Sequence, residues 1–165
     1  MAGPGPILED MDTTIMARAI ELSREGMHAG DGGPFGAVVV RDGVIIAEAT
    51  DLVLGTNDPT AHAEVVALRR AAEKLGSFTL AGCELYASCE PCPMCLGAIY
   101  WARVKRVFFA NTRHDAASIG FDDTLIYEEL SRPVGQRSID VVHAPDQRAR
   151  DVFGEWLAKG DRVEY

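Results

Sequence analysis

We expect no segment of this sequence to direct export or to span a membrane. Its first six residues lack the basic and apolar regions of a signal peptide, and no apolar run approaches the roughly 20 residues that a spanning helix requires. Cysteine is scarce as well, with four residues, at positions 83, 89, 92 and 95. We therefore expect a cytoplasmic protein with reduced thiols and no membrane contact.

Positive charge is also scarce. Lysine and arginine total 16 against 25 acidic residues, which gives a net charge of −9. Because nucleic-acid-binding proteins draw most of their affinity from basic side chains on phosphates, this balance argues against a nucleic-acid partner. Short basic clusters at 69–70, 103–106 and 148–150 fall on predicted helices or at their edges, where a solvated face is the simpler interpretation.

No repeat, linker or low-complexity block divides the 165 residues. We expect one α/β domain over residues 12–165 behind a frayed Gly/Pro-rich tail at 1–11. Apolar spacing and turn residues predict helices over 13–27, 60–75, 92–102 and 124–131, with a closing helix after Asp146. The predicted strands are 37–41, 44–49, 85–88, 104–110 and 139–142.

Local signals support several of these boundaries. Asp12 and Asp146 are suited to cap the first and last helices, and Asp42-Gly43 is a strong hairpin signal. The glycine-rich stretch 30–36 matches no phosphate-binding pattern, so it predicts either a tight turn or backbone close to a ligand. The last helix carries an apolar stripe that we expect to pack in the core. Its members are Ala149, Val152, Phe153, Trp156 and Leu157.

Two short motifs thirty residues apart carry the chemistry. The first is Thr-Ala-His-Ala-Glu, which contains His62 and Glu64, and the second is Pro-Cys-Pro-Met-Cys, which contains Cys92 and Cys95. Together they read H-x-E…P-C-x-x-C, the signature of zinc-dependent base deamination. One histidine and two cysteines make three zinc ligands, which leaves a fourth position for water, as in catalytic zinc sites.

The spacing of the motifs suits this chemistry. Cys92 and Cys95 are three residues apart, so they face the same way on a helix. At a helix N-terminus the dipole and free N–H groups favour the thiolates that zinc binds. His62 lies near the start of the preceding predicted helix, so two helix N-termini can meet at one metal. Zinc brings the pKa of a bound water towards about 7, and Glu64 is placed to carry a proton to a ring nitrogen and the leaving amine.

A redox role for the Cys-x-x-C pair and an ordinary core or surface role for His62 are the alternatives. The upstream Glu64 and the strand–helix context favour catalytic zinc over both. We interpret Cys83 and Cys89 as packing residues. The remaining histidines lack comparable partners in the sequence and are interpreted as surface or internally bonded residues; they are His28, His114 and His143.

Beyond the motifs, the sequence resembles the cytidine-deaminase-like superfamily, and within it the small bacterial guanine deaminases. The resemblance covers nearly the whole chain, and the run from Ser88 to Arg103 is its most specific part. The other matching stretches are residues 33–38, 57–64, 115–117, 120–123 and the final Glu164-Tyr165.

The resemblance implies a three-layer α/β/α fold with a mixed five-stranded sheet. It also implies a homodimer in which the C-terminal segment, residues 145–165, swaps onto the partner's active site. On this basis one zinc per subunit is held by His62, Cys92 and Cys95, and Glu64 shuttles protons. The resemblance also implies the roles of four further residues. Asp123 assists proton transfer to the leaving amine. Phe35 and Trp101 line the base pocket, and Tyr165 closes it from the neighbouring subunit. Without the resemblance, Asp123 reads as a surface acid and Tyr165 as a frayed end.

Asp51 departs from the family pattern, because guanine deaminases carry an asparagine there to bond the purine. An asparagine amide both donates and accepts, whereas an ionised aspartate only accepts. Burying a carboxylate against an acceptor nitrogen is costly. Either Asp51 therefore lies off the substrate-binding site, or the preferred substrate presents an N–H there.

The predicted function is hydrolytic deamination of a free purine base, with guanine becoming xanthine and ammonia. The alternatives are a related aminated heterocycle such as a pterin, an aminotriazine or a cytosine-type base, or a purine nucleoside. A tRNA adenosine deaminase shares the zinc motifs, but the acidic balance of the chain counts against it. A silent zinc-stabilised interaction domain has no need of Glu64 beside an open zinc position.

Overall fold

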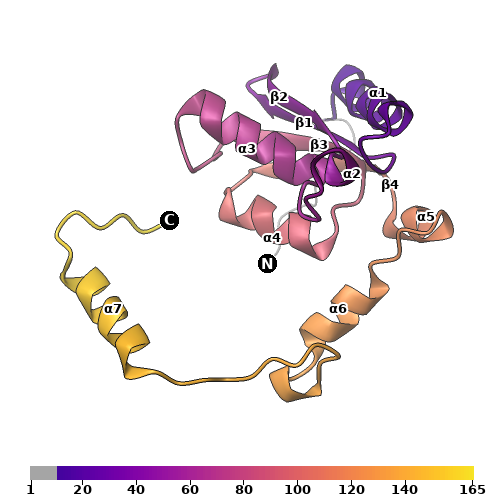
Figure 1. Ribbon diagram of the computed structural model, residues 1–165. Helices are drawn as coiled ribbons and strands as arrows, with labels where there is room; N and C mark the ends of the chain where they lie inside the picture. The colour runs from indigo at the N-terminus through magenta and orange to yellow at the C-terminus, as the bar shows by residue number, and fades with distance from the viewer. Residues whose placement is uncertain (1–10) are drawn as a thin grey trace, which may run out of the picture. The chain divides into compact units, whose positions relative to one another are not determined.

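The computed structural model describes residues 11–165 (Figure 1). The chain divides into two compact units, the first ending at Asp123 and the second spanning Thr124–Tyr165. Apart from Met11, which packs against the helix α1 (Thr13–Ala29) cluster, the expected tail at 1–11 lies outside the described residues. That residues 12–165 form one domain stays a prediction.

The first unit is built on a four-stranded mixed sheet in the order β2-β1-β3-β4. Strand β1 (Gly36–Arg41) pairs antiparallel with both β2 (Val44–Thr50) and β3 (Cys83–Cys89). Strand β4 (Arg106–Asn111) pairs with β3 in parallel. The mixed sheet is as expected, and the four expected strands of this unit lie within two residues of their predicted starts and ends.

The expected fifth strand at 139–142 is absent, so the prediction of five strands was wrong. Ile139 and Val142 are 75 % and 82 % exposed, and in the described part of the chain their backbone groups form no ladder with another strand. An extended apolar run becomes a strand only when a neighbour pairs with its N–H and C=O groups. The apolar composition of residues 139–142 was therefore not sufficient to predict a strand.

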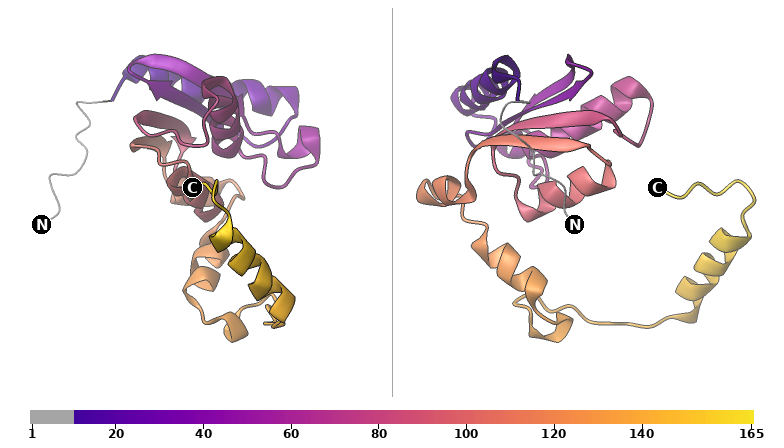
Figure 2. Two further views of the ribbon diagram at one scale, coloured as in Figure 1. Left: turned by 90° about the vertical axis from the view of Figure 1, so that its left-hand side faces the viewer. Right: turned by 180° about the vertical axis from the view of Figure 1, so that it is seen from behind.

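Helices cover both faces of the sheet, which confirms the three-layer arrangement (Figure 1, Figure 2). Alternate residues of a strand point to opposite faces. Val38 and Val40 pack with α1 in one apolar cluster. Val39 and Leu85 pack in the other cluster, together with α3 (Ala63–Leu75) and α4 (Pro93–Trp101).

Backbone geometry at two positions in this unit accounts for the residue types found there. Asp42 and Gly43 both have positive φ, at 51° and 76°, as a two-residue hairpin turn between β1 and β2 requires. At Gly36 a Cβ atom would lie 2.3 Å from the carbonyl oxygen of Ala19 on α1. Glycine is therefore needed where α1 crosses the start of β1.

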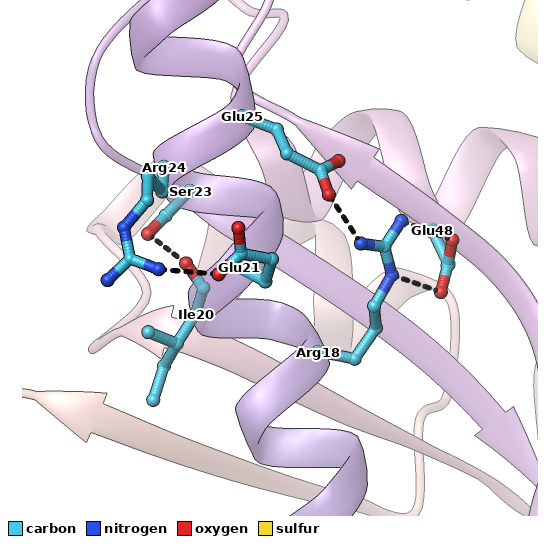
Figure 3. Close-up of polar contacts among 7 residues, drawn as sticks. All are labelled: Arg18, Ile20, Glu21, Ser23, Arg24, Glu25 and Glu48. Carbon is cyan, nitrogen blue, oxygen red and sulfur yellow. Dashed lines mark hydrogen bonds and ion pairs between the residues drawn. The ribbon is translucent and has the colours of Figure 1, made fainter.

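Polar contacts fasten α1 to the edge of the sheet (Figure 3). The Arg18 guanidinium bonds both carboxylate oxygens of Glu48 on β2, with its Nε 2.9 Å from Oε1, and also reaches Glu25. Asp12 caps α1 as predicted, because its carboxylate accepts from the backbone N–H groups of Thr14 and Ile15.

Two short helices of the first unit were not predicted. These are α2 (Val53–Thr56) and α5 (Arg113–Ser118). Helix α5 begins with a capping box in which Thr112 accepts from the Asp115 N–H and the Asp115 carboxylate accepts from the Thr112 N–H. This Thr-x-x-Asp pattern is a sequence signal that could have located α5.

The second unit contains α6 (Thr124–Ser131), the 3-10 turn η2 (Val134–Gln136) and α7 (Gln147–Ala158). Asp146 caps α7 as predicted, by accepting from the Arg148 N–H. The apolar stripe of α7 is not in the core, contrary to our expectation, since Val152, Phe153 and Leu157 are 57–73 % exposed. Their helical spacing shows a common face without showing what covers it. Over the described residues, no helix has the length and apolar character needed to cross a membrane.

Candidate metal centre and active site

The three predicted metal ligands meet at two helix N-termini, as expected. His62 is the N-cap of α3, and Cys92 is the N-cap of α4, with Pro93 next to it in the first helical turn. Pro93 suits that turn, where a missing N–H costs nothing. Cys95 follows one turn into α4 and is fully buried. Strand β3 ends at Cys89 and leads directly into residues 90–95, the cysteine loop, so the sheet fixes the position at which this loop begins.

The ligand atoms form a near-equilateral triangle. The Nδ1 atom of His62 lies 3.6 Å from the Sγ atoms of both Cys92 and Cys95, and the two Sγ atoms lie 3.6 Å apart. Zinc–sulfur and zinc–nitrogen bonds of about 2.3 and 2.05 Å at a tetrahedral angle place ligand atoms about 3.6–3.8 Å apart. The donor set and its spacing therefore fit a tetrahedral zinc ion with one position left for a non-protein ligand.

Glu64 lies in the first turn of α3 and faces the same triangle. Its Oε2 atom is 3.5 Å from the Cys95 Sγ, and the residue is 7 % exposed. Burial raises the pKa of the Glu64 carboxyl to about 7. A carboxyl group with a pKa near neutrality can both take and return a proton at the working pH of most enzymes.

The charges of the ligand residues depend on one another. Hydrogen bonding with Cys95 and then with His62 lowers the pKa of the Cys92 thiol, while the same contact with Cys92 raises that of Cys95. The bond to Cys92 raises the pKa of His62. Without metal the group therefore favours a Cys92 thiolate, and a thiolate is what a zinc ligand must become.

Asp123 lies in the same region and is also partly buried. Its pKa is raised by burial, an effect that the positive charge of Arg113 opposes and the negative charge of Cys92 reinforces. Its Oδ1 atom is 3.6 Å from the Arg113 Nε. The Arg113 backbone N–H in turn donates to Glu90, two residues before Cys92, so the structure links Asp123 to the segment that carries the cysteines, although the two are about thirty residues apart in sequence.

The Asp51 side chain accepts hydrogen bonds from backbone N–H groups of nearby residues. It is 4 % exposed, and its Oδ1 accepts from the N–H groups of Gly33 at 3.4 Å and Val53 at 3.1 Å. Its own N–H donates to the Phe35 carbonyl. A Cβ atom on Gly32 would lie 1.9 Å from this carboxylate oxygen, so glycine is required where the loop passes over Asp51. The close backbone approach in loop 30–36 is thus to a side chain of the protein itself.

Phe35 follows this loop and is half-buried. Its ring meets that of Phe121 edge to face, with centroids 4.9 Å apart and an interplanar angle of 89°. Asp51 and the residue after it connect this area to the metal ligands, because the Leu52 N–H donates to the carbonyl of Ala61, next to His62. The structure therefore brings Phe35 and Asp51 to the same end of the sheet as the metal ligands.

Trp101 and Tyr165 were predicted to line and to close the base pocket, and they lie in the first and the second unit, respectively. Trp101 is 67 % exposed and ends α4, about 13 Å along the helix axis from Cys92 at 1.5 Å per residue. It lines a surface hollow with Gly97, Tyr100 and Arg103. Tyr165 is 71 % exposed at the end of the second unit. Their places in a base pocket stay predictions.

The histidines and cysteines outside the motifs behave as interpreted. His28, His114 and His143 are exposed, and Cys83 and Cys89 are buried. Sequence reasoning missed Arg113 and Phe121, the direct neighbours of Asp123 and Phe35. Arg113 lies in no matching stretch, and Phe121 lies in the stretch 120–123, in which only Asp123 was given a role.

This site defines the class of the protein. Residues 9–111 match the family described as the cytidine and deoxycytidylate deaminase zinc-binding region. The chain belongs to that family, and it is accordingly a hydrolytic deaminase.

Comparison with individual proteins shows which members of the family this chain is similar to. The chain is 51 % identical to the guanine deaminase of Bacillus subtilis over 152 residues, which cover 92 % of this chain and 97 % of the relative. The X-ray structure of that guanine deaminase superposes with a TM-score of 0.91 and covers 94 % of this chain and 99 % of the other.

More distant relatives share the same core. The guanine deaminase structure from Nitrosomonas europaea has a TM-score of 0.63 at 39 % identity and covers 67 % of this chain and 64 % of the other. The tRNA-specific adenosine deaminase of Haemophilus influenzae is 38 % identical over 71 % of this chain and 70 % of its own length.

Proposed function

We propose that this protein hydrolyses free guanine to xanthine and ammonia. The observation that carries the proposal is the triangle of His62, Cys92 and Cys95 with the buried Glu64 carboxyl beside it. The 51 % identity with a guanine deaminase over nearly the whole chain supports guanine over other bases. The identity with the tRNA-specific adenosine deaminase is lower and covers less of the chain.

When bound, zinc supplies a Lewis acid that makes a water acidic enough to give hydroxide near neutral pH. In the reaction, the water oxygen bonds to the ring carbon that bears the amine, and the bond to the amine breaks. Glu64 takes a proton from the water and delivers it to the adjacent ring nitrogen. The remaining hydroxyl proton passes to the amine, which leaves as ammonia, and Asp123 assists this second transfer.

The base would lie between the metal ligands and the loop that carries Phe35, with the Phe35 ring against the base. Aromatic faces bind planar heterocycles through stacking and apolar contact. Asp51 commits one carboxylate oxygen to the Gly33 and Val53 N–H groups. Any contact of Asp51 with the substrate is therefore made by its other carboxylate oxygen. This oxygen can only accept a hydrogen bond, so it favours a substrate that presents an N–H group. Trp101 and Tyr165 would complete the pocket.

We propose one zinc per subunit and a homodimer in which residues 145–165 reach the partner's site. The exposed apolar stripe of α7 supports such an association, because large apolar surfaces are costly in water. A cytoplasmic location is supported by the four cysteines, none of which forms a disulfide among the described residues.

The decisive experiment replaces Glu64 with glutamine in the zinc-loaded protein and measures ammonia release from guanine. Glutamine keeps the size of the side chain and cannot carry the proton, so we expect zinc content to be unchanged and kcat to fall by roughly 10²–10⁴-fold. Full activity in this variant would contradict the mechanism.

The same assay on the parent with guanosine, cytosine, a pterin, an aminotriazine and a tRNA anticodon stem as competitors tests the substrate. A preference for any of these over guanine would overturn that part of the proposal. Equal inactivity on all of them, with zinc bound, would point instead to a silent domain.

A further inference from the structure

Asp123 is the last residue of the five-residue connection, 119–123, between α5 and α6, and it lies outside both helices. Its carboxylate is nevertheless only 16 % exposed and lies 3.6 Å from Arg113, whose backbone N–H bonds Glu90, two residues before Cys92. A side chain on such a segment stays beside a metal centre only if neighbouring groups fix it. The backbone N–H groups of residues 119–121 bond to carbonyl groups of α5, and side chains of this connection contact Phe35 and Arg113.

The backbone of Arg113 is hydrogen-bonded to the cysteine loop. Its backbone N–H donates to the Glu90 Oε2 at 3.0 Å, and the Glu90 N–H donates to the carbonyl oxygen of Asn111 at 2.8 Å. Glu90 stands two residues before Cys92, so the start of α5 is bonded to the segment that supplies two metal ligands. The Thr112–Asp115 capping box fixes the same helix end from the other side.

From this fixed start the Arg113 side chain reaches Asp123. The Nε–Oδ1 distance is 3.6 Å, and the two side chains are 25 % and 16 % exposed. Ion pairs at fully exposed sites contribute little, but this pair is largely withdrawn from water. The Phe121 ring against Phe35 holds the same segment two residues earlier.

We propose that Arg113 is a positioning residue for the deamination, holding the Asp123 carboxylate beside the metal centre while Glu90 holds Arg113 against the cysteine loop. The inference rests on the proposed function, in which Asp123 assists proton transfer to the amine. Arg113 does not touch the substrate in this scheme. It acts only through Asp123.

A double-mutant cycle tests that dependence. Arg113→Ala should lower kcat on guanine by roughly 10- to 100-fold, as expected when a catalytic group is displaced by about 1 Å, with KM changed less than about threefold and zinc content unchanged. Arg113→Lys should recover part of the loss, because it keeps the positive charge. In an Asp123→Asn background, Arg113→Ala should have no further effect on kcat.

Arg18 offers a control, because it pairs with Glu48 on β2, the strand at the opposite edge of the sheet from β4, with the two side chains 35 % and 33 % exposed. Arg18→Ala should leave kcat unchanged. If Arg113→Ala behaves like Arg18→Ala, or if its effect persists undiminished in the Asp123→Asn background, the inference is wrong. Thermal melting of each variant separates these outcomes from misfolding, and Arg113→Lys decides if the alanine variant does not fold.

Failure of the proposed function gives a different result. If the zinc-loaded parent does not deaminate guanine, that function is refuted whatever Arg113 does. A crystal structure of the zinc-loaded Arg113→Ala variant then decides the positioning role by itself. Displacement of the Asp123 carboxylate from the cysteine loop supports the inference, and an unmoved carboxylate overturns it.

Discussion

Replacing Asp51 with alanine would remove the acceptor that ties the glycine loop to α2 beside the metal centre. Two backbone N–H groups, those of Gly33 and Val53, converge on the Asp51 Oδ1. The residue is 4 % exposed, so water cannot easily take the place of the missing oxygen. Phe35 follows the same loop, and its carbonyl accepts from the Asp51 N–H.

The expected cost follows from the two donors. A buried donor left without a partner costs about 1–3 kcal/mol, so Asp51→Ala should destabilise the protein by about 2–6 kcal/mol. In a protein of this size each kcal/mol lowers Tm by roughly 2–4 °C, and the melting temperature should therefore fall by at least about 4 °C. Asp51→Asn keeps one acceptor oxygen for both N–H groups and should cost much less.

Thermal melting of the zinc-loaded variants, followed by circular dichroism, measures these differences, and guanine kinetics on the same samples report the site. Asp58 supplies a matched control. Its carboxylate also accepts from a backbone N–H, that of Thr60 at 2.8 Å, but at the surface. Asp58→Ala should shift Tm far less than Asp51→Ala.

Two outcomes would refute this reasoning. If Asp51→Ala melts within about 2 °C of the parent, the carboxylate is not holding the loop. If Asp51→Asn is as destabilised as Asp51→Ala, the charge matters more than the acceptor. A change in the ratio of activities on guanine and its competitors in Asp51→Asn, without loss of stability, would indicate that the second oxygen also meets the substrate.

Two further predictions concern the core and the metal-free state. Gly36→Ala should destabilise the protein by about 1–3 kcal/mol, because its Cβ would lie 2.3 Å from the Ala19 carbonyl and 2.6 Å from the Ser23 nitrogen, both backbone atoms. Thermal melting measures it, and an unchanged Tm would mean that α1 shifts freely over the sheet. In chelator-treated protein, burial raises the pKa of Glu64 from 4.5 to about 7, so the folded state holds this proton more tightly and stability falls as pH rises from about 4.5 to 7. At 1.36 kcal/mol per pKa unit, Glu64→Gln should gain about 3 kcal/mol relative to the parent between pH 4 and 8 in urea unfolding. A difference that does not vary with pH would contradict this.

The parts of the fold that the sequence predicted are those with strong local signals. Helix α1 has an aspartate cap and regular apolar spacing, and the β1–β2 hairpin has Asp42-Gly43 at its turn. The metal ligands were predictable because their chemistry demands particular residue types at particular spacings. These features depend on neighbours along the chain.

The failures depend on distant partners. Residues 139–142 have the composition of a strand but find no ladder, and the stripe of α7 has the spacing of a core helix but is exposed. The pairing of Arg113 with Asp123 joins two residues through a turn of the fold that no local pattern encodes. Asp51 is intermediate, since its departure from the family residue was visible, but its bonds to Gly33 and Val53 were not.

The cysteine loop follows β3, which is paired with another strand on each side. Five of its residues pair with β1 and five with β4, and six of its seven residues are buried. Amides in such a strand exchange with solvent only when the whole sheet opens, whereas loop segments open at far lower free energy. Segments outside the sheet can therefore open locally at a lower free energy than the strand that leads into the cysteines. We expect substrate to enter and product to leave by local opening outside the sheet, with the strand that leads into the metal ligands still paired on both sides.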